Sequence, residues 1–220
     1  LFHAGGVGVG QGRPDAAESV QVRSLSLRYA RAFGLQRLEA DVGLVDYTYD
    51  TYRQLDLLAR NHDLRWRWAV TPWLTGSLRT QRDESVNSFD DATVLTRGNR
   101  RVRRFDGADL RWQLDGAWSL VADVQEVRNA NEQPLIGEES TRLRSGAVGL
   151  RRDTPKGSSA AFRWRSGRGE TIDPDRAPVP LRDDDFQQDE WLLDLRWAAS
   201  ARTRIDANIA RIERRHERVA

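Results

Sequence analysis

The sequence predicts an all-β protein, an antiparallel up-and-down transmembrane β-barrel with about ten strands in these 220 residues. Three observations predict this class. Apolar and polar residues alternate with a period of two, short and long connections alternate along the chain, and tryptophans gather near the short connections. We expect a single β-barrel domain over residues 1–220, as a fragment of a larger barrel that lacks the signal peptide and the C-terminal strands.

The period-two alternation is clearest around the first tryptophans, where Leu64, Trp66 and Trp68 alternate with Arg65 and Arg67. Successive side chains of a strand point to opposite faces, so the pattern indicates a strand with one apolar and one polar face. The same alternation recurs, in chain order, over residues 38–44, 64–70, 74–79, 108–114, 118–125, 193–197 and 205–209.

Two kinds of connection separate these strands. Short turn signals occur at residues 33–35, 70–72, 114–116, 154–157 and 199–201, and longer polar segments occupy residues 50–57, 83–100, 128–140 and 167–185. The two kinds alternate along the chain. That alternation is typical of a transmembrane barrel, in which hairpin turns lie on one side and long loops on the other.

The placement of tryptophan favours a membrane. Indole has an apolar body and one N–H donor, so it settles where hydrocarbon meets water and forms aromatic girdles there. Near the long loops, Tyr47, Tyr49, Tyr52, Phe105 and Trp191 predict a second girdle, although aromatic residues could also fill the core of a β-sandwich. The girdle predicted beside the short turns comprises Trp66, Trp68, Trp73, Trp112, Trp118 and Trp197.

The polar face of the predicted strands is densely charged. A charge in the middle of the hydrocarbon costs about 2–4 kcal/mol, but inside a closed sheet it can face water and pair with the opposite sign on the next strand. A solvated outer face of a soluble sheet would show the same pattern. The residues predicted to line a pore are Arg65, Arg67, Arg79, Asp109, Arg111, Asp123, Arg163, Arg165, Asp194, Arg196 and Asp206.

Composition narrows the functions further. The chain has no cysteine, which excludes disulfides and a thiolate site, and its 35 basic and 33 acidic residues nearly balance, which argues against nucleic-acid binding. His3, His62 and His216 lie too far apart for a helix-spaced metal motif. We therefore expect no catalytic residue, no metal and no cofactor, and we predict that the protein is not an enzyme.

Several strand-and-turn phrases carry a resemblance to a known family. They lie at residues 36–38, 47–49, 71–78, 87–91, 155–159, 186–191 and 211–216. The chain resembles the outer-membrane β-barrel proteins of exosortase-associated (PEP-CTERM type) exopolysaccharide biosynthesis loci, often called EpsL-type proteins. The resemblance extends over nearly all 220 residues, but it rests on no catalytic fingerprint.

The resemblance implies a non-enzymatic pore or secretion protein in the outer membrane of a Gram-negative bacterium, serving exopolysaccharide export or biosynthesis. Its partners would be outer-membrane lipid and lipopolysaccharide, an extracellular polysaccharide, and the export machinery. The residues themselves leave two alternatives open. One is a soluble β-sandwich or propeller that binds glycans or mediates adhesion, and the other is an outer-membrane barrel hydrolase.

Overall fold

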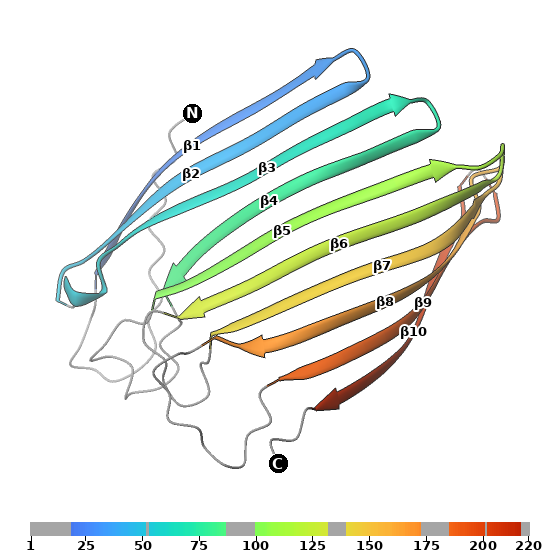
Figure 1. Cartoon of the computed structure of the whole chain (residues 1–220). Coiled ribbons are helices and arrows are strands. Elements are labelled where there is room, and N and C mark those ends of the chain that lie inside the picture. Colours follow the sequence, from blue (N-terminus) through green and yellow to red (C-terminus); the bar gives the residue numbers. More distant parts are fainter. Residues whose placement is uncertain are drawn as a thin grey trace.

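The computed structural model describes residues 19–51, 53–86, 100–131, 140–172, 185–200 and 202–216. Within these residues the chain forms one ten-stranded antiparallel sheet in which every strand pairs with its neighbour in sequence (Figure 1). The predicted all-β, up-and-down antiparallel fold is confirmed. The sheet does not close, because β1 pairs with β2 alone and β10 with β9 alone.

The strands are 13 to 15 residues long, about 45 Å at the rise of an extended chain. They are β1 (Val20–Phe33), β2 (Gln36–Tyr49), β3 (Leu57–Thr71), β4 (Leu74–Val86), β5 (Arg100–Gln113), β6 (Trp118–Asn131), β7 (Thr141–Asp153), β8 (Ser159–Thr171), β9 (Phe186–Ala198) and β10 (Arg204–His216).

The five short turns lie where the sequence predicts them. Gly34 has a φ of 60° in the two-residue turn between β1 and β2, a backbone conformation that primed hairpin turns require and that glycine adopts without a steric penalty. A bulge between Ala69 and Thr71 precedes the next turn, in which the Thr71 hydroxyl accepts a hydrogen bond from the Leu74 amide at 3.0 Å. Side-chain acceptors thus stabilise turns that lack glycine.

The strands extend beyond the segments predicted as strands at the other end of the sheet. Residues 83–86, 128–131 and 167–171, predicted as loop, pair within β4, β6 and β8. These segments are polar and contain Asp, Asn or Gly, which were taken as signs of loop. The connection between β2 and β3 holds a 3-10 turn, η1 (Arg53–Leu55), and the other three predicted loops lie largely outside the described residues.

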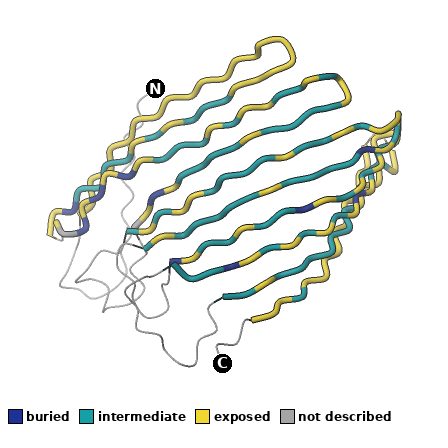
Figure 2. Tube along the Cα trace, in the orientation of Figure 1, coloured by how far each residue is buried: buried dark blue, intermediate teal, exposed yellow. Residues whose placement is uncertain are grey.

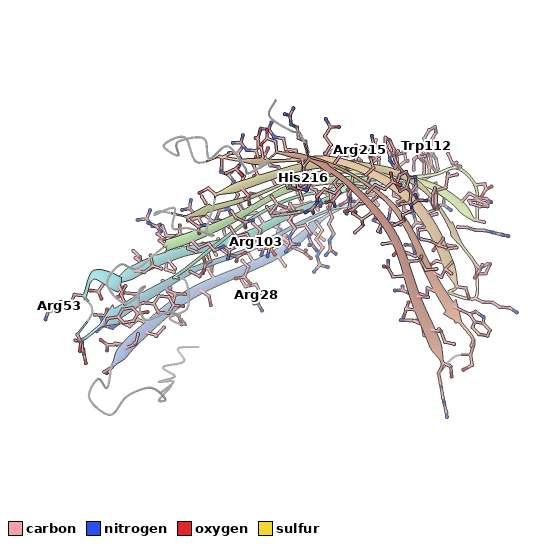
Figure 3. All side chains as sticks on the ribbon, turned by 90° about the horizontal axis from the view of Figure 1, so that it is seen from below. Arg28, Arg53, Arg103, Trp112, Arg215 and His216 are labelled. Atoms are coloured by element: carbon pink, nitrogen blue, oxygen red, sulfur yellow. The ribbon has the colours of Figure 1, made fainter. Side chains whose placement is uncertain are left out.

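The sheet is a single curved layer with little buried apolar surface (Figures 2 and 3). Most buried apolar side chains gather beside η1, where Leu55 is 2% exposed and Ala59 fully buried, next to Tyr49 and Leu57. Among the described residues no second layer covers either face. The fold is therefore neither the sandwich nor the propeller that remained as an alternative, because both bury their sheets against other sheets or pack short four-stranded blades.

No helix in the described ranges is long and apolar enough to span a membrane.

Candidate functional site on the polar face

All eleven residues predicted to line a pore lie on one face of the sheet. The ladders set Arg65 opposite Arg79, and Asp109 opposite both Ser77 and Asp123, so these side chains share a face. The same registers, followed to β10, bring the remaining members onto it. The eleven are Arg65, Arg67, Arg79, Asp109, Arg111, Asp123, Arg163, Arg165, Asp194, Arg196 and Asp206.

This polar face is the hollow side of the curved sheet. A hollow of about 660 Å³ is lined by polar-face residues from β5 to β10, among them Asp109, Arg163 and Asp206, and a second of about 760 Å³ lies over β1 to β8. Seen along the strands, Arg28 of the polar face lies beneath the arch, whereas Trp112 of the other face lies above it (Figure 3). We call the two sides the concave and the convex face.

Ion pairs join neighbouring strands across the concave face. Both guanidinium nitrogens Nε and Nη2 of Arg79 donate to the Asp63 carboxylate, at 2.9 and 2.7 Å. Arg163 donates to Asp194 at 2.6 Å, on the next strand along. Further pairs of this kind are Arg28–Asp41, Arg67–Glu39 and Arg196–Asp206.

Two ion pairs cross a whole strand. Arg111 on β5 reaches Asp153 on β7 at 2.7 Å, and Arg165 on β8 lies 3.5 Å from Asp123 on β6. Strands two apart are about 9.6 Å from one another, so such a bridge needs a long side chain and a small residue beneath it. Ser119, fully buried, lies beneath the first bridge and accepts a hydrogen bond from Arg111 at 3.1 Å.

Like charges directly opposite one another recur on the concave face. Arg65 faces Arg79, and Asp109 faces Asp123. Such pairs are destabilising unless other groups compensate them. Here Arg79 binds Asp63, its diagonal neighbour, and Asp109 accepts a hydrogen bond from the hydroxyl of Ser77 directly opposite it. The charges thus form a connected ladder of polar groups facing a water-accessible hollow.

The convex face near the short turns is apolar and exposed. Leu27 is 69%, Val148 45%, Phe162 52% and Trp197 59% exposed. This exposure is far more than a soluble single-layer sheet would leave to water. Five of the six predicted girdle tryptophans lie on this face by register. Four of them, Trp66, Trp112, Trp118 and Trp197, have 41–59% of their surface exposed. The fifth, Trp68, is half-buried against Gly76, and the sixth, Trp73, lies in a turn.

The second girdle is wrong for three of its five predicted members. Tyr47, Tyr49 and Phe105 belong to the register of the concave face, where Arg79 stacks over the Phe105 ring at 5.8 Å. Trp191 is on the convex face, opposite Trp164 and two residues from charged positions. Tyr52 lies outside the described residues. At the long-loop end the convex positions are charged instead of aromatic.

The boundary between apolar and charged residues on the convex face is slanted relative to the strands. The last apolar residue before the charged stretch is Leu25 on β1 and Ile209 on β10. The ladders carry the level of Leu27 to Arg82 on β4, so the level of Leu25 lies two residues beyond Arg82, and they carry the level of Ile209 to Leu74 on the same strand. The two ends of the boundary are thus about ten residues apart over nine strand-to-strand steps. The boundary therefore shifts by about one residue per strand, an inclination of about 37° between the strands and the normal to the boundary.

The described residues hold no cluster of three or more His, Asp or Glu side chains arranged to bind a metal. His62 lies on the convex face of β3 and His216 ends β10, next to the ring of Phe186 at 6.0 Å. His3 lies outside the described residues. The polar groups of the site are mainly arginines, carboxylates and hydroxyls, whose chemistry suits charged or hydrated solutes.

Comparison with known proteins adds little to this geometry. No family model matches the chain, and no curated protein matches it. A solved structure similar to this chain is that of Pseudomonas aeruginosa OccK2 (OpdF) in complex with glucuronate, at 12% identity and a TM-score of 0.24. The match covers 91% of this chain and 86% of that chain. The class of the protein follows from its own strand order and register: an all-β, up-and-down antiparallel sheet with one charged and one apolar face.

Proposed function

We propose that this chain is part of an outer-membrane β-barrel that conducts solutes through a water-filled lumen lined by its concave face. On this proposal the convex apolar band faces lipid, the short turns lie at one surface of the membrane, and the protein performs no chemical reaction. The bacterial outer membrane is the location proposed, because barrels of this kind are typical of it.

The slanted boundary is the observation that carries the proposal. Transmembrane barrel strands are inclined by about 35–45° to the membrane normal, so the edge of the hydrocarbon layer crosses each strand about one residue further along than the previous one. The apolar band of this chain has that slope, about 37° by its register from Leu25 on β1 to Ile209 on β10. The slope is an average between the two end strands, since Leu78, Ala108 and Val124 on β4 to β6 stand at one level. A soluble sheet has no reason to shift its apolar edge in one direction across ten strands.

The concave face supplies the chemistry of a lumen. Of the eleven residues predicted to line the pore, seven are arginines and four are aspartates. Polar side chains along a water-filled lumen help to solvate permeating ions, and an excess of charge of one sign attracts counter-ions into a narrow aqueous space. We therefore expect a conductance with a modest preference for anions.

The first experiment is reconstitution of the full-length protein. The protein should require detergent for extraction from cells and should give discrete conductance steps in planar lipid bilayers. A protein found soluble in the periplasm without detergent, or one that inserts without conductance, would overturn the proposal.

Ion selectivity then tests which face lines the lumen. Arg163→Glu, on the concave face, should shift the reversal potential in a salt gradient toward cation preference. Arg104→Glu is the matched control, since it makes the same change of charge on the convex face of β5. Equal shifts from both variants would contradict the assignment of the faces.

Export of an extracellular polysaccharide is the more specific role that we propose, and it is supported by the family resemblance alone. Deletion of the gene should abolish polysaccharide in the culture medium while polymer accumulates inside the cell envelope. Unchanged secretion would leave a general channel as the function.

A further inference from the structure

Arginines are concentrated on the convex face just beyond the apolar band. On β4 to β8 this face carries seven arginines and four carboxylates between the band and the strand ends, the carboxylates being Glu84, Asp106, Glu126 and Glu170. We call the following six of the arginines the convex arginine belt: Arg82, Arg104, Arg128, Arg142, Arg144 and Arg168.

Four members of the belt stand directly opposite one another on consecutive strands. The ladders pair Arg82 with Arg104, Arg104 with Arg128, and Arg128 with Arg142. Side chains opposite one another are about 5 Å apart at Cβ, and like charges at that distance are destabilising. A row of four arginines in register therefore costs stability. Arg144 and Arg168 form a further like-charge pair in register, and an anion bridging these two would relieve their repulsion.

Each arginine of this row has a carboxylate partner, but the carboxylates are fewer than the arginines around them. Arg82 binds Glu84, which also binds Arg100. The single carboxylate of Glu126 accepts hydrogen bonds from both Arg128 and Arg144, the second at 2.7 Å. Arg142 lies 2.8 Å from Glu170. Arg104 lies 3.0 Å from Asp106. Arg168 lies 3.5 Å from Asp185. Arg144 and Arg168 nevertheless keep 59% and 55% of their side-chain surface exposed, so an anion can reach both guanidinium groups beside their carboxylate partners.

A groove on the convex face joins the belt to the apolar band. Its volume is about 720 Å³, and its floor includes Ala108, Gly146 and Ser166, whose small side chains leave a depression between the strands. Val124, 60% exposed, forms its apolar side. Arg144 and Arg168 lie at its charged end, each two residues along its strand from the floor, and the carboxylates of Asp106 and Glu126 line the same end.

We infer that the belt and the groove together bind a phosphate-bearing lipid of the surrounding membrane, with an acyl chain in the groove and the phosphate on Arg144 and Arg168. The inference rests on the proposed function, because it requires the convex face to meet lipid. The groove selects this occupant. A free phosphate would use the arginines alone and leave the apolar floor unfilled, whereas a lipid has both the charge and the chain that the site is shaped to take.

The test is direct binding to the full-length protein in a nonionic detergent, measured by native mass spectrometry. The probes are diphosphorylated lipid A, its dephosphorylated form, and inorganic phosphate. The phosphorylated lipid should bind at least tenfold more tightly than either of the others. Equal binding of both lipid forms would remove the role of the arginines, and equal binding of inorganic phosphate would remove the role of the groove.

Two variants divide the site. Arg144→Gln combined with Arg168→Gln should weaken binding of the phosphorylated lipid by about tenfold or more, since each basic residue near an anionic surface contributes about fivefold. Gly146→Leu should fill the groove and weaken both lipid forms. A Cβ at Gly146 meets Val124 at an ordinary 3.6 Å, so the larger side chain has room to point outward.

Arg152→Gln is the matched control, because Arg152 lies on the same face and strand as Arg144 but at the short-turn end, over the Trp118 ring. It should leave lipid affinity unchanged, and an equal loss would overturn the inference. Insertion into neutral phosphatidylcholine vesicles is measured on the same samples. A protein that inserts and conducts but shows no preference for the phosphorylated lipid refutes this inference alone, whereas failure to insert refutes the barrel as well.

Discussion

The guanidinium of Arg111 on β5 lies 2.7 Å from the carboxylate of Asp153 on β7, with the whole of β6 between them. Backbone hydrogen bonds join each strand only to its immediate neighbours. This bridge and the one between Arg165 and Asp123 instead tie strands two apart, and they hold the hydroxyl or methyl of the strand between them beneath a guanidinium. They therefore couple three strands through side chains.

The coupling can be measured as a double-mutant cycle. Arg111→Gln, Asp153→Asn and the double variant should give an interaction free energy of about 0.5–1 kcal/mol, modest because both groups are more than three-tenths exposed to water. Urea unfolding of the full-length protein in lipid vesicles measures it. The more exposed pair Arg196 and Asp206 is the control and should have a smaller interaction free energy. An equal interaction free energy in that pair would show that the strand-crossing bridge is no stronger than a bridge between neighbouring strands.

Ala147 tests the need for a small residue under a bridge. It is 7% exposed and stands between Asp123 and Arg165 in register. Ala147→Leu should separate that pair and lower the free energy of unfolding by about 1–3 kcal/mol. Val148→Leu, one residue along on the exposed convex face, should change it by less than about 0.5 kcal/mol. A tolerated leucine at residue 147 would mean that the concave face is looser than the structure shows.

The depth of the apolar band can be probed by one substitution at two levels. Leu110→Arg, on the convex face two residues inside the level of Trp112 and opposite Gly76 and Ala122, should cost about 2–4 kcal/mol of unfolding free energy in vesicles, as expected for arginine in hydrocarbon. Ala130→Arg, on the same face beyond the charged boundary, should cost about 0–1 kcal/mol. Equal costs at both levels would argue against a membrane edge between them.

The turn between β5 and β6 should respond to acid through Asp115. Its carboxylate accepts hydrogen bonds from the amides of Trp118 and Ala117, which hold the pKa of Asp115 below its usual value. A lowered folded-state pKa contributes stability that is present above the unfolded-state pKa of about 3.9 and is lost as the pH falls through the folded-state pKa. The difference in unfolding free energy between the wild type and Asp115→Asn should therefore shrink between pH 5 and pH 2. A difference independent of pH would show that the charge is not what caps this turn.

The sequence was sufficient for the strands, the short turns and the sharing of one face by the charged residues, because all three follow from a period of two. It was insufficient at the long-loop end. Residues 128–131 and 167–171 are polar and were predicted as loop, yet they continue β6 and β8, because a barrel strand that extends beyond the hydrocarbon can carry polar residues on both faces. Tyr47 and Phe105 were assigned to a girdle from their position along the chain, without regard to the face on which they lie.

The bridge from Arg111 to Asp153 could not be predicted from the sequence either. It depends on the relative registers of three strands, and each register depends on turn geometry such as the bulge between Ala69 and Thr71. Alternation within a strand carries no information on that offset. The convex arginine belt has the same origin, since its four aligned members become neighbours only when the hairpins are paired.

The slope of the apolar edge also sets a scale for any ring that these strands complete. Ten strands spaced about 4.8 Å apart and tilted by about 37° fit around a cylinder no narrower than about 10 Å in radius, measured to the backbone. An extended arginine reaches inward for roughly two-thirds of that distance. In the tightest such ring, opposing guanidinium groups would nearly meet at the axis, and the passage would be governed by how these side chains fold back onto the wall.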